Sequence, residues 1–452
     1  MASGAANIPD LTATAAGLTT VAVFAIAYFL VITEEFTHLR KSKPVVVAAG
    51  VVWVLVAFAW HSHGLVGATD LLRENALELG ELLLFLVAAM TYVNTLEERN
   101  VFAALRSALV ARRLTLRAVF WITGALAFFL SPVLDNLTTA LVVGAVALAL
   151  GRGNRAFVAP ACINIVVAAN AGGAFSPFGD ITTLMVWQKG VVTFFEFFRL
   201  FVPSLVNWLV PAICMSLAIP PGMPESESGR VRMLPGGGAV IALFAVTIVI
   251  TVAMHQFLHL PPFLGMMTGL GLLQVAGYFI RRRELSQRVP DGVAEGARES
   301  ANTRREVFDI FANMRRVEWD TLLFFYGVIL CVGGLAALGY LALLSQASYA
   351  ALGPTTANVL VGLASAVVDN IPIMFAVLTI APDMSHGQWL LVTLTAGVGG
   401  SLLSIGSAAG VALMGQARGV YTFFSHLRWS WAVALGYAAS IWAHFLVNAA
   451  LF

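Results

Sequence analysis

The sequence predicts an all-α polytopic membrane protein built from two inverted repeats of five spans, each with a re-entrant hairpin and a broken helix. The prediction rests on the composition, on the number of long apolar stretches, and on motifs that recur in the same order in both halves. Of the 452 residues, 59% are hydrophobic and 11% are charged, against about 25% charged in an average globular protein. The mean hydropathy is +0.86. So few charged side chains cannot cover a soluble surface of this size, which places the chain in lipid.

Composition also excludes several classes of partner. A net charge of +2 leaves no concentrated basic face, so we expect no nucleic-acid partner. The three cysteines, Cys162, Cys214 and Cys331, stand in separate apolar stretches without a CxxC spacing. They are expected to be packing residues, because neither a disulfide pattern nor a metal-ligand pattern is present. No cofactor is expected.

A helix needs about 20 apolar residues to cross the hydrocarbon core of a bilayer. Ten stretches meet this requirement: 15–33, 44–60, 79–98, 156–188, 200–219, 238–256, 262–280, 319–343, 388–417 and 430–451. The tail 1–14 precedes them outside the membrane, and the N-terminal stretch lacks the basic region of a secretory signal. We therefore expect the first span to be retained.

Two further apolar stretches, 118–150 and 354–382, are too long for one helix and are interrupted by polar turn residues. We interpret each as a re-entrant hairpin that returns to the side from which it entered. With both termini outside, 23 of the 26 basic residues then fall on the cytoplasmic side, and only Arg73, Lys189 and Arg199 fall outside. An odd number of crossings in either stretch would abolish this bias, which normally sets orientation.

The chain accordingly divides into a first repeat at 15–219, a cytoplasmic linker at 220–237 and a second repeat at 238–452. The first contains the hairpin 118–150 and the broken helix 156–188, and the second contains a cytoplasmic loop at 281–318, the hairpin 354–382 and the broken helix 388–417. Three paired motifs, separated by 239, 234 and 227 residues, support the repeat: Glu81 with Asp320, Asp135-Asn136 with Asp369-Asn370, and Gly172-Gly173 with Gly399-Gly400. Inverted repeats with paired discontinuous helices are typical of secondary transporters.

Three carboxylates remain at membrane depth once loops and span ends are set aside: Asp135, Asp180 and Asp369. No lysine or arginine remains with them. A carboxylate at this depth costs at least a few kcal/mol, so it is protonated, paired or bound to a cation. Without a basic partner, protonation and cation binding are left, and the sequence predicts a cation site.

Oxygen-bearing neighbours fit that prediction, because hard cations bind carboxylate, amide, hydroxyl and backbone carbonyl oxygens. They are Asn136, Thr138, Thr139, Asn170, Thr182, Thr183, Ser404 and Ser407. The glycines and the proline between Asn170 and Asp180 break the helix and release carbonyls. Such residues also serve in helix packing alone, so Thr139, Ser131 and Ser401 fit either role equally. Glu81 and Asp320 begin their spans, where an acid suits the helix dipole.

Three segments resemble the NhaD-type sodium/proton antiporters of the ion-transporter superfamily, which also includes divalent anion/sodium symporters. They are Ser131-Pro-x-x-Asp135-Asn136-Leu-Thr-Thr, Asn170-Ala-Gly-Gly-x-x-Ser-Pro-x-Gly-Asp180-Ile-Thr-Thr and Glu318-Trp-Asp320-Thr-Leu-Leu-Phe-Phe. The likeness runs from about Glu81 to the end of the chain. Family members often carry a histidine seven residues before the position of Glu81, and here that position is Glu74.

The resemblance implies exchange of Na⁺ or Li⁺ for H⁺, a role in pH homeostasis, a bacterial inner membrane and a homodimer with an elevator-like transport domain. Transported ions and membrane lipid are then the other partners. It also implies functional roles for Asp135, Asn136, Thr138, Asn170, Asp180, Thr182, Thr183, Ser365, Asn370, Ser404 and Ser407. We add Asp369 to this predicted Na⁺/H⁺ site because it is one of the three carboxylates at membrane depth.

Two other functions compete with ion exchange. A dicarboxylate or arsenite carrier of the same fold would have to overcome the repulsion between an anion and three buried acids. By resemblance, carboxylate symporters also carry Ser-Asn-Thr where this chain has Asp-Asn. An intramembrane aspartyl protease would use two membrane aspartates, but its Gly-x-Gly-Asp pattern is broken by Pro177. The sequence therefore favours a transporter over an enzyme.

Overall fold

The computed structural model describes residues 9–37, 39–112, 114–151, 154–223, 231–286 and 308–452. These residues form helices joined by loops, with no strand among them. Ten of the described helices are long and apolar enough to cross a membrane, as expected for a polytopic membrane protein. By its internal contacts the chain forms two compact units, Met1–Leu79, Leu109–Ser228 and Trp319–Phe452 in the first and Gly80–Ala108 and Gly229–Glu318 in the second.

The first unit begins with a layer of long helices, α1 (Ala15–Ile32), α3 (Ser42–Ser62) and α15 (Trp319–Ala337), with the short α2 (Glu34–Thr37) between the first two. Two tryptophans join α3 to α15. Trp53 donates from its indole nitrogen to Leu330 O at 2.9 Å, and Trp60 donates to Ala337 O at 3.0 Å. Each indole N–H thus forms a hydrogen bond with a buried backbone carbonyl, so α3 packs against α15 without leaving these polar groups unpaired.

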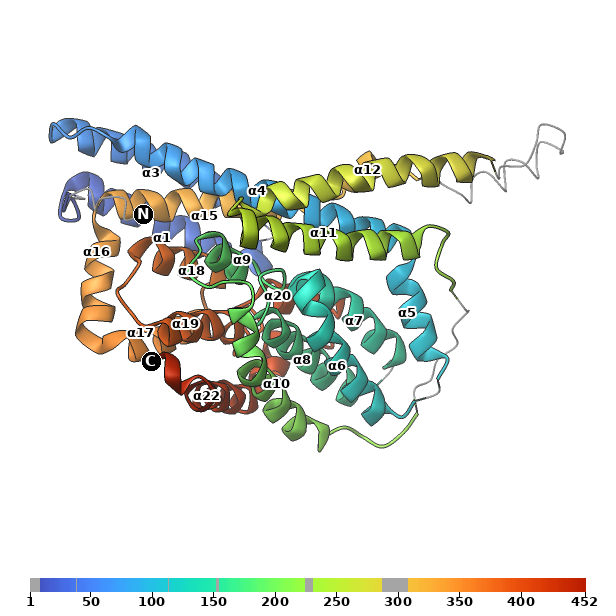
Figure 1. Ribbon diagram of the computed structural model, residues 1–452. Coiled ribbons are helices and arrows are strands. Elements are labelled where there is room, and N and C mark those ends of the chain that lie inside the picture. Colours follow the sequence, from blue (N-terminus) through green and yellow to red (C-terminus); the bar gives the residue numbers. More distant parts are fainter. Residues whose placement is uncertain (1–8, 38, 113, 152–153, 224–230, 287–307) are drawn as a thin grey trace. The chain divides into compact units, whose positions relative to one another are not determined.

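Two helical hairpins follow the predicted positions. The first consists of α6 (Leu116–Leu134) and α7 (Asn136–Leu150), separated by Asp135 alone. The second consists of α17 (Ala351–Ala364) and α18 (Asn370–Ile380), separated by a five-residue turn. In Figure 1, α6 and α7 lie beside α8, and α17 lies beside α19. Each turn ends at an aspartate, whose carboxylate caps the helix that follows, as helix N-termini favour.

Both broken helices are present. The first is α8 (Arg155–Gly173) and α9 (Ile181–Gln188), and the second is α19 (His386–Gly399) and α20 (Ala408–Gln416). Glycine is required where each meets a hairpin arm. A methyl group at Gly172 would lie 2.2 Å from Phe128 O, and one at Gly399 would lie 2.0 Å from Gly362 O. The backbones therefore touch in both places.

The remaining helices of the first unit cover this assembly. They are η1 (Glu196–Leu200), α10 (Phe201–Ser216), α16 (Tyr340–Ser345), η2 (Gln346–Ala350), α21 (Phe423–Leu427), α22 (Ser430–Val447) and η3 (Ala449–Leu451). The largest contact among them joins α10 to α22. In Figure 1, α10 is green and α22 is dark red, and the two helices pack against each other.

The second unit contains most of α4 (Ala68–Glu98), together with α5 (Val101–Val110), α11 (Gly237–Leu258), α12 (Pro262–Ser286) and α14 (Ile310–Arg315). Tyr92 ties it together by donating from its hydroxyl to Gly269 O at 2.7 Å. Arg99 is buried at 1% exposure, and it pairs with Glu98 and Glu284 and lies over the ring of Phe308. A buried guanidinium needs such compensation.

Several predicted boundaries were wrong. The helix predicted at 79–98 begins at Ala68, and α12 continues to Ser286 instead of ending at 280. The span predicted at 319–343 ends at Ala337, because Gly339 has a φ of +95° that a helix cannot include. The ten long helices also differ from the ten predicted spans. They include α6, whereas the stretch 388–417 forms two shorter helices.

Parts of three predicted segments lie outside the described residues. They are 1–8 of the N-terminal tail 1–14, 224–230 of the linker 220–237, and 287–307 of the loop 281–318.

Candidate functional site

Asp180 lies at the centre of a buried polar cluster in the first unit. It ends the break of the first broken helix and caps α9, accepting from Thr182 N at 3.0 Å on Oδ1. Its other oxygen, Oδ2, accepts from the side-chain amides of Asn136 at 2.7 Å and Asn370 at 3.1 Å. Asp180 is 5% exposed. The asparagines of the two Asp-Asn motifs, one from each hairpin tip, thus converge on one oxygen.

Asn170, in the last turns of α8, connects this carboxylate with the second broken helix. Its Oδ1 accepts from Asn136 Nδ2 at 3.0 Å. Its Nδ2 donates to Ser401 Oγ at 2.8 Å and to Ser407 Oγ at 3.0 Å. Ser407 also caps α20, where its hydroxyl accepts from Gly410 N. Asn170 is completely buried, so the cluster forms a continuous polar path through an apolar interior.

Asp135 occupies the tip of the first hairpin with φ +66° and ψ 162°. Residues other than glycine rarely adopt this region, and such strain concentrates at functional sites. The carboxylate accepts from Thr138 N at 2.7 Å and from Thr138 Oγ1 at 3.0 Å. Asp135 therefore adjoins the Asp180 cluster through Asn136, the next residue in the chain.

Other residues considered for the site use their hydroxyls to hold the hairpins and breaks in shape. Ser365 donates to Ala396 O at 2.9 Å, and Ser131 donates to Ala169 O at 2.6 Å. Thr183 donates to Ser176 O and to Asp180 O, at 2.8 and 2.7 Å. These hydroxyls remain acceptors, but their protons are engaged by backbone carbonyls. They position the cluster.

Three buried hydroxyls near these breaks have no hydrogen-bond partner among the described residues: Thr139 Oγ1, Thr182 Oγ1 and Ser404 Oγ. All three side chains are completely buried. A buried polar atom without a partner costs about 1–3 kcal/mol, and such exceptions often mark an ion or water position. In the described residues no group of three or more His, Cys, Asp or Glu could hold a metal ion. The donor set here is amide, hydroxyl and carboxylate oxygen, which suits a hard monovalent cation.

The expectation that no basic side chain pairs with the three membrane carboxylates was wrong for Asp369. Lys41, at the start of α3, places its Nζ 3.7 Å from Asp369 Oδ2. The sequence assigned Lys41 to a cytoplasmic loop, and no local pattern connects it with a residue more than 300 positions later. Asp369 also caps α18 by accepting from Ile371 N at 3.3 Å. It lies beside Asn370, not within the contacts of Asp180.

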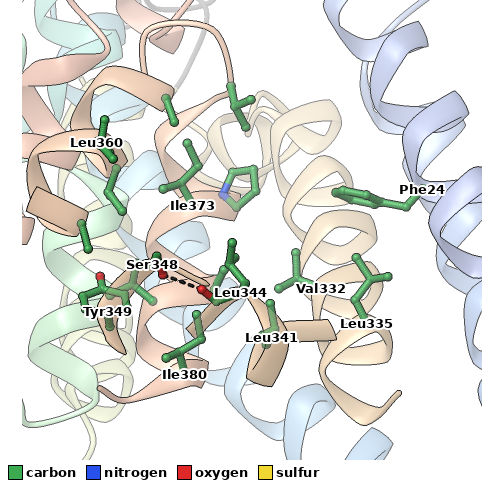
Figure 2. Close-up of a pocket in the computed structure, with 17 residues that line it drawn as sticks. Phe24, Val332, Leu335, Leu341, Leu344, Ser348, Tyr349, Leu360, Ile373 and Ile380 are labelled. Atoms are coloured by element: carbon green, nitrogen blue, oxygen red, sulfur yellow. Dashed lines mark hydrogen bonds between the residues drawn. The ribbon is translucent and has the colours of Figure 1, made fainter. Parts of the chain in front are cut away.

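An apolar cavity of about 390 Å³ lies on another face of the second hairpin. Figure 2 shows Leu360 and Ile373 of the hairpin facing Val332 of α15 and Phe24 of α1. Its two polar lining side chains are Ser348, which donates to Leu344 O, and Tyr349, which donates to Asn358 Oδ1. The lining of this cavity therefore offers no oxygen cluster to a cation.

Sequence reasoning left the role of Ser401 open and missed Tyr28. Ser401 fitted a packing role equally well, and its counterpart at a separation of 227 residues is Ala174, which gives no polar signal. Tyr28, in α1, accepts from the backbone N–H of Asp369 at 3.0 Å. Both contacts join positions far apart in the chain, so only the folded structure identifies them.

Known proteins resemble this chain over nearly its whole length. The profile of the family described as Citrate transporter (CitMHS) matches residues 18–397. The Na(+)/H(+) antiporter NhaD of Alkalimonas amylolytica is 53% identical over 449 residues, which cover 98% of this chain and 93% of that protein. The protein of the same name from Vibrio cholerae is 54% identical over 445 residues, with 97% and 93% covered. Sodium/proton antiporter 1 of Arabidopsis thaliana is 31% identical over 440 residues, with 94% and 72% covered.

A resemblance first visible in three short segments thus extends over nearly the whole chain, at more than half identity to bacterial proteins. The chain belongs to the NhaD family of Na⁺/H⁺ antiporters, within the wider family of transporters that the profile describes.

Proposed function

We propose that this protein is a secondary transporter that exchanges Na⁺ or Li⁺ for H⁺ through a carboxylate site centred on Asp180. The supporting observation is that the hydrogen-bond donors to this buried carboxylate, among the described residues, are all neutral: Asn136, Asn370 and the Thr182 N–H. Neutral donors do not cancel its charge. Moving the site through the membrane therefore needs either a proton or a cation on the carboxylate.

The remaining residues of the site have different roles in this proposal. Asn136, Asn170, Asn370 and Ser407 orient Asp180, whereas Thr139, Thr182 and Ser404 offer buried hydroxyl oxygens to the ion. Asp135 supplies a second carboxylate at the hairpin tip, beside Asn136. Thr138, Thr183 and Ser365 hold the hairpins and breaks in shape, and Asp369 orients Asn370. Na⁺, Li⁺ and H⁺ are substrates, and no cofactor takes part.

Two carboxylates near one site explain obligatory exchange. At low pH, protons occupy the carboxylates and exclude Na⁺. As the pH rises the protons leave, and Na⁺ becomes the compensating charge. An empty charged site is the costly state to move, so transport in one direction with Na⁺ requires return with protons.

The test is Na⁺-dependent proton movement in everted vesicles or proteoliposomes, followed with a pH probe and without any organic substrate. Added Na⁺ or Li⁺ should collapse an imposed proton gradient. The competing function is transport of an organic anion such as a dicarboxylate, or of arsenite, by a protein of the same fold. The matched profile, described as Citrate transporter, is the observation that supports this second candidate. Proton movement that requires such an anion and ignores Na⁺ would favour that carrier.

The fold is further proposed to be an inverted repeat, 15–219 and 238–452. Paired details support it at the separation of 227 residues. Gly173 and Gly400 each lie so close to a later glycine carbonyl, Gly179 O or Gly406 O, that a methyl group would come within 2.6 Å. The two caps that close the breaks also match, since Asp180 has φ −150° and ψ 151° and Ser407 has φ −140° and ψ 148°.

Topology follows from the repeat and can be labelled. We place the protein in a bacterial inner membrane as a homodimer, with both termini outside and the two hairpins entering from opposite faces. In a background without Cys162, Cys214 and Cys331, a cysteine at Arg155 should react with a membrane-impermeant reagent from the cytoplasm. One at Gln346 should react from outside. Labelling of both from one side would contradict the inverted repeat.

A further inference from the structure

Lys41 is a charged residue outside the Asp180 cluster that nevertheless contacts the tip of the second hairpin. Its Nζ lies 3.7 Å from Asp369 Oδ2, and the two side chains are 20% and 14% exposed. The ammonium also lies 4.4 Å from the centre of the Phe324 ring on α15. A cation above an aromatic face is attracted to it, more strongly when water is partly excluded. Asp369 and Phe324 thus hold the Lys41 ammonium from two different elements.

The surroundings fix Lys41 and Asp369 relative to the layer of α1, α3 and α15. The backbone N–H of Asp369 donates to Tyr28 Oη at 3.0 Å. The hydroxyl of Ser42, the first residue of α3, donates to the carboxylate of Asp320 at the start of α15. Lys41 therefore approaches the hairpin tip from a rigid point, the beginning of a packed helix.

The position of Asp369 affects the ion site through the backbone of the first turn of α18. It is the cap of α18, and the next residue, Asn370, donates from Nδ2 to Asp180 Oδ2 at 3.1 Å. A shift of the Asp369 carboxylate moves the first turn of α18 and with it the Asn370 amide. An amide displaced by about 1 Å no longer makes a proper hydrogen bond.

We propose that Lys41 is a positioning residue for the cation site: its ion pair with Asp369 holds the tip of the second hairpin so that Asn370 orients Asp180. This inference rests on the proposed exchange function. Lys41 touches no transported ion in this scheme, and its contribution is to the geometry of the loaded site. Na⁺ affinity is the property that should depend on it.

The experiment measures kcat and apparent KM for Na⁺ in proteoliposomes at one fixed pH for K41M, K41R and the matched control K43M. Lys43 is a neighbouring exposed lysine on the same helix. K41M should raise the apparent KM about tenfold, equivalent to about 1.4 kcal/mol, with little change in kcat. K41R keeps the charge and should restore most of the affinity. K43M should match the wild type.

A KM for K41M within twofold of the wild type would overturn the proposal. So would equal loss in K41M and K41R, because the charge would then not be what matters. If K41M is not recovered as folded protein, F324L removes the ring but keeps both charges, and it should raise KM about threefold. An unchanged KM for F324L would then count against the proposal. Failure of the proposed function looks different, since wild-type protein itself would show no Na⁺-coupled proton flux.

Discussion

The side-chain amide of Asn170 donates a hydrogen bond to the hydroxyl of Ser401, 2.8 Å away and 231 positions later in the chain. Shifted by 227 residues, the corresponding positions are Gly397 and Ala174. They also lie together, since a methyl group at Gly397 would come 3.4 Å from the Ala174 side chain. One member of this pair of contacts is polar and the other is apolar. Under the proposed repeat, the cation site is therefore lopsided, with its polar groups gathered around Asp180.

The first prediction concerns the central carboxylate. Asp180→Asn should reduce Na⁺-coupled proton flux to below about a hundredth of the wild type, a loss of about 2.7 kcal/mol or more. The asparagine keeps the size of the side chain but has no charge for Na⁺ or H⁺ to compensate. The flux is measured in everted vesicles at equal protein level. Asp70→Asn, at a position where the side chain is 76% exposed, is the control and should keep full activity. More than a tenth of wild-type flux in Asp180→Asn would refute the assignment.

The second prediction separates binding from packing on one helix. Asn170→Ala and Asn164→Ala both remove a completely buried amide from α8. Asn164 donates to Phe120 O and accepts from Trp208 Nε1, both at 2.8 Å, away from the ion site. Each change should destabilise the protein by about 1–3 kcal/mol, because buried partners lose their hydrogen bonds.

Only Asn170→Ala should also raise the apparent KM for Na⁺, by about tenfold, since it alone disconnects Asn136 from Ser401 and Ser407. Thermal unfolding in detergent and KM in proteoliposomes give the two readouts. Similar KM values for both variants would assign Asn170 to packing alone.

The third prediction compares the two hairpin tips. Asp369→Asn should impair exchange less than Asp135→Asn. The charge of Asp369 is already balanced by Lys41 at 3.7 Å, and the second break offers Ser407 where the first has Asp180. Initial exchange rates at saturating and at limiting Na⁺ distinguish them. Equal loss in both variants would mean that the two halves contribute equally, against the lopsided site.

The fourth prediction is the pH dependence of Na⁺ affinity. Protons and Na⁺ compete for the same carboxylates, so the apparent KM for Na⁺ should fall steeply as the pH rises. It should level off once the carboxylates are fully ionised, because no proton is then left to displace. Carboxylates that share one site titrate together, so the fall should follow the pair as a unit. Reconstituted wild-type protein assayed at several pH values provides the measurement. A pH-independent KM over the active range would exclude the shared site.

Much of the fold was predictable because its signals are local. Long apolar stretches mark helices that cross a membrane, and glycine, proline and aspartate mark where such helices stop. Asp135, Asp180, Asp369 and Ser407 each cap the helix that follows, as a polar residue before an apolar run indicates. Boundaries such as the start of α4 at Ala68 were predicted poorly, since the polar turns that precede its apolar part are still helical.

The sequence by itself determined that the chain is a polytopic membrane protein with two hairpins and two broken helices, and that a few carboxylates without a basic residue nearby in the sequence lie at their turns. Only the tertiary structure decided which of them meet. Asn136 and Asn370 converge on Asp180, whereas Lys41 reaches Asp369 across 328 positions of the chain. The physical reason is that capping and helix breaking depend on a few neighbouring residues, which a sequence displays. Hydrogen bonds and ion pairs between distant segments depend on how the helices pack. A single side chain long enough to span two segments can then pair with a buried charge that has no such partner nearby in the sequence.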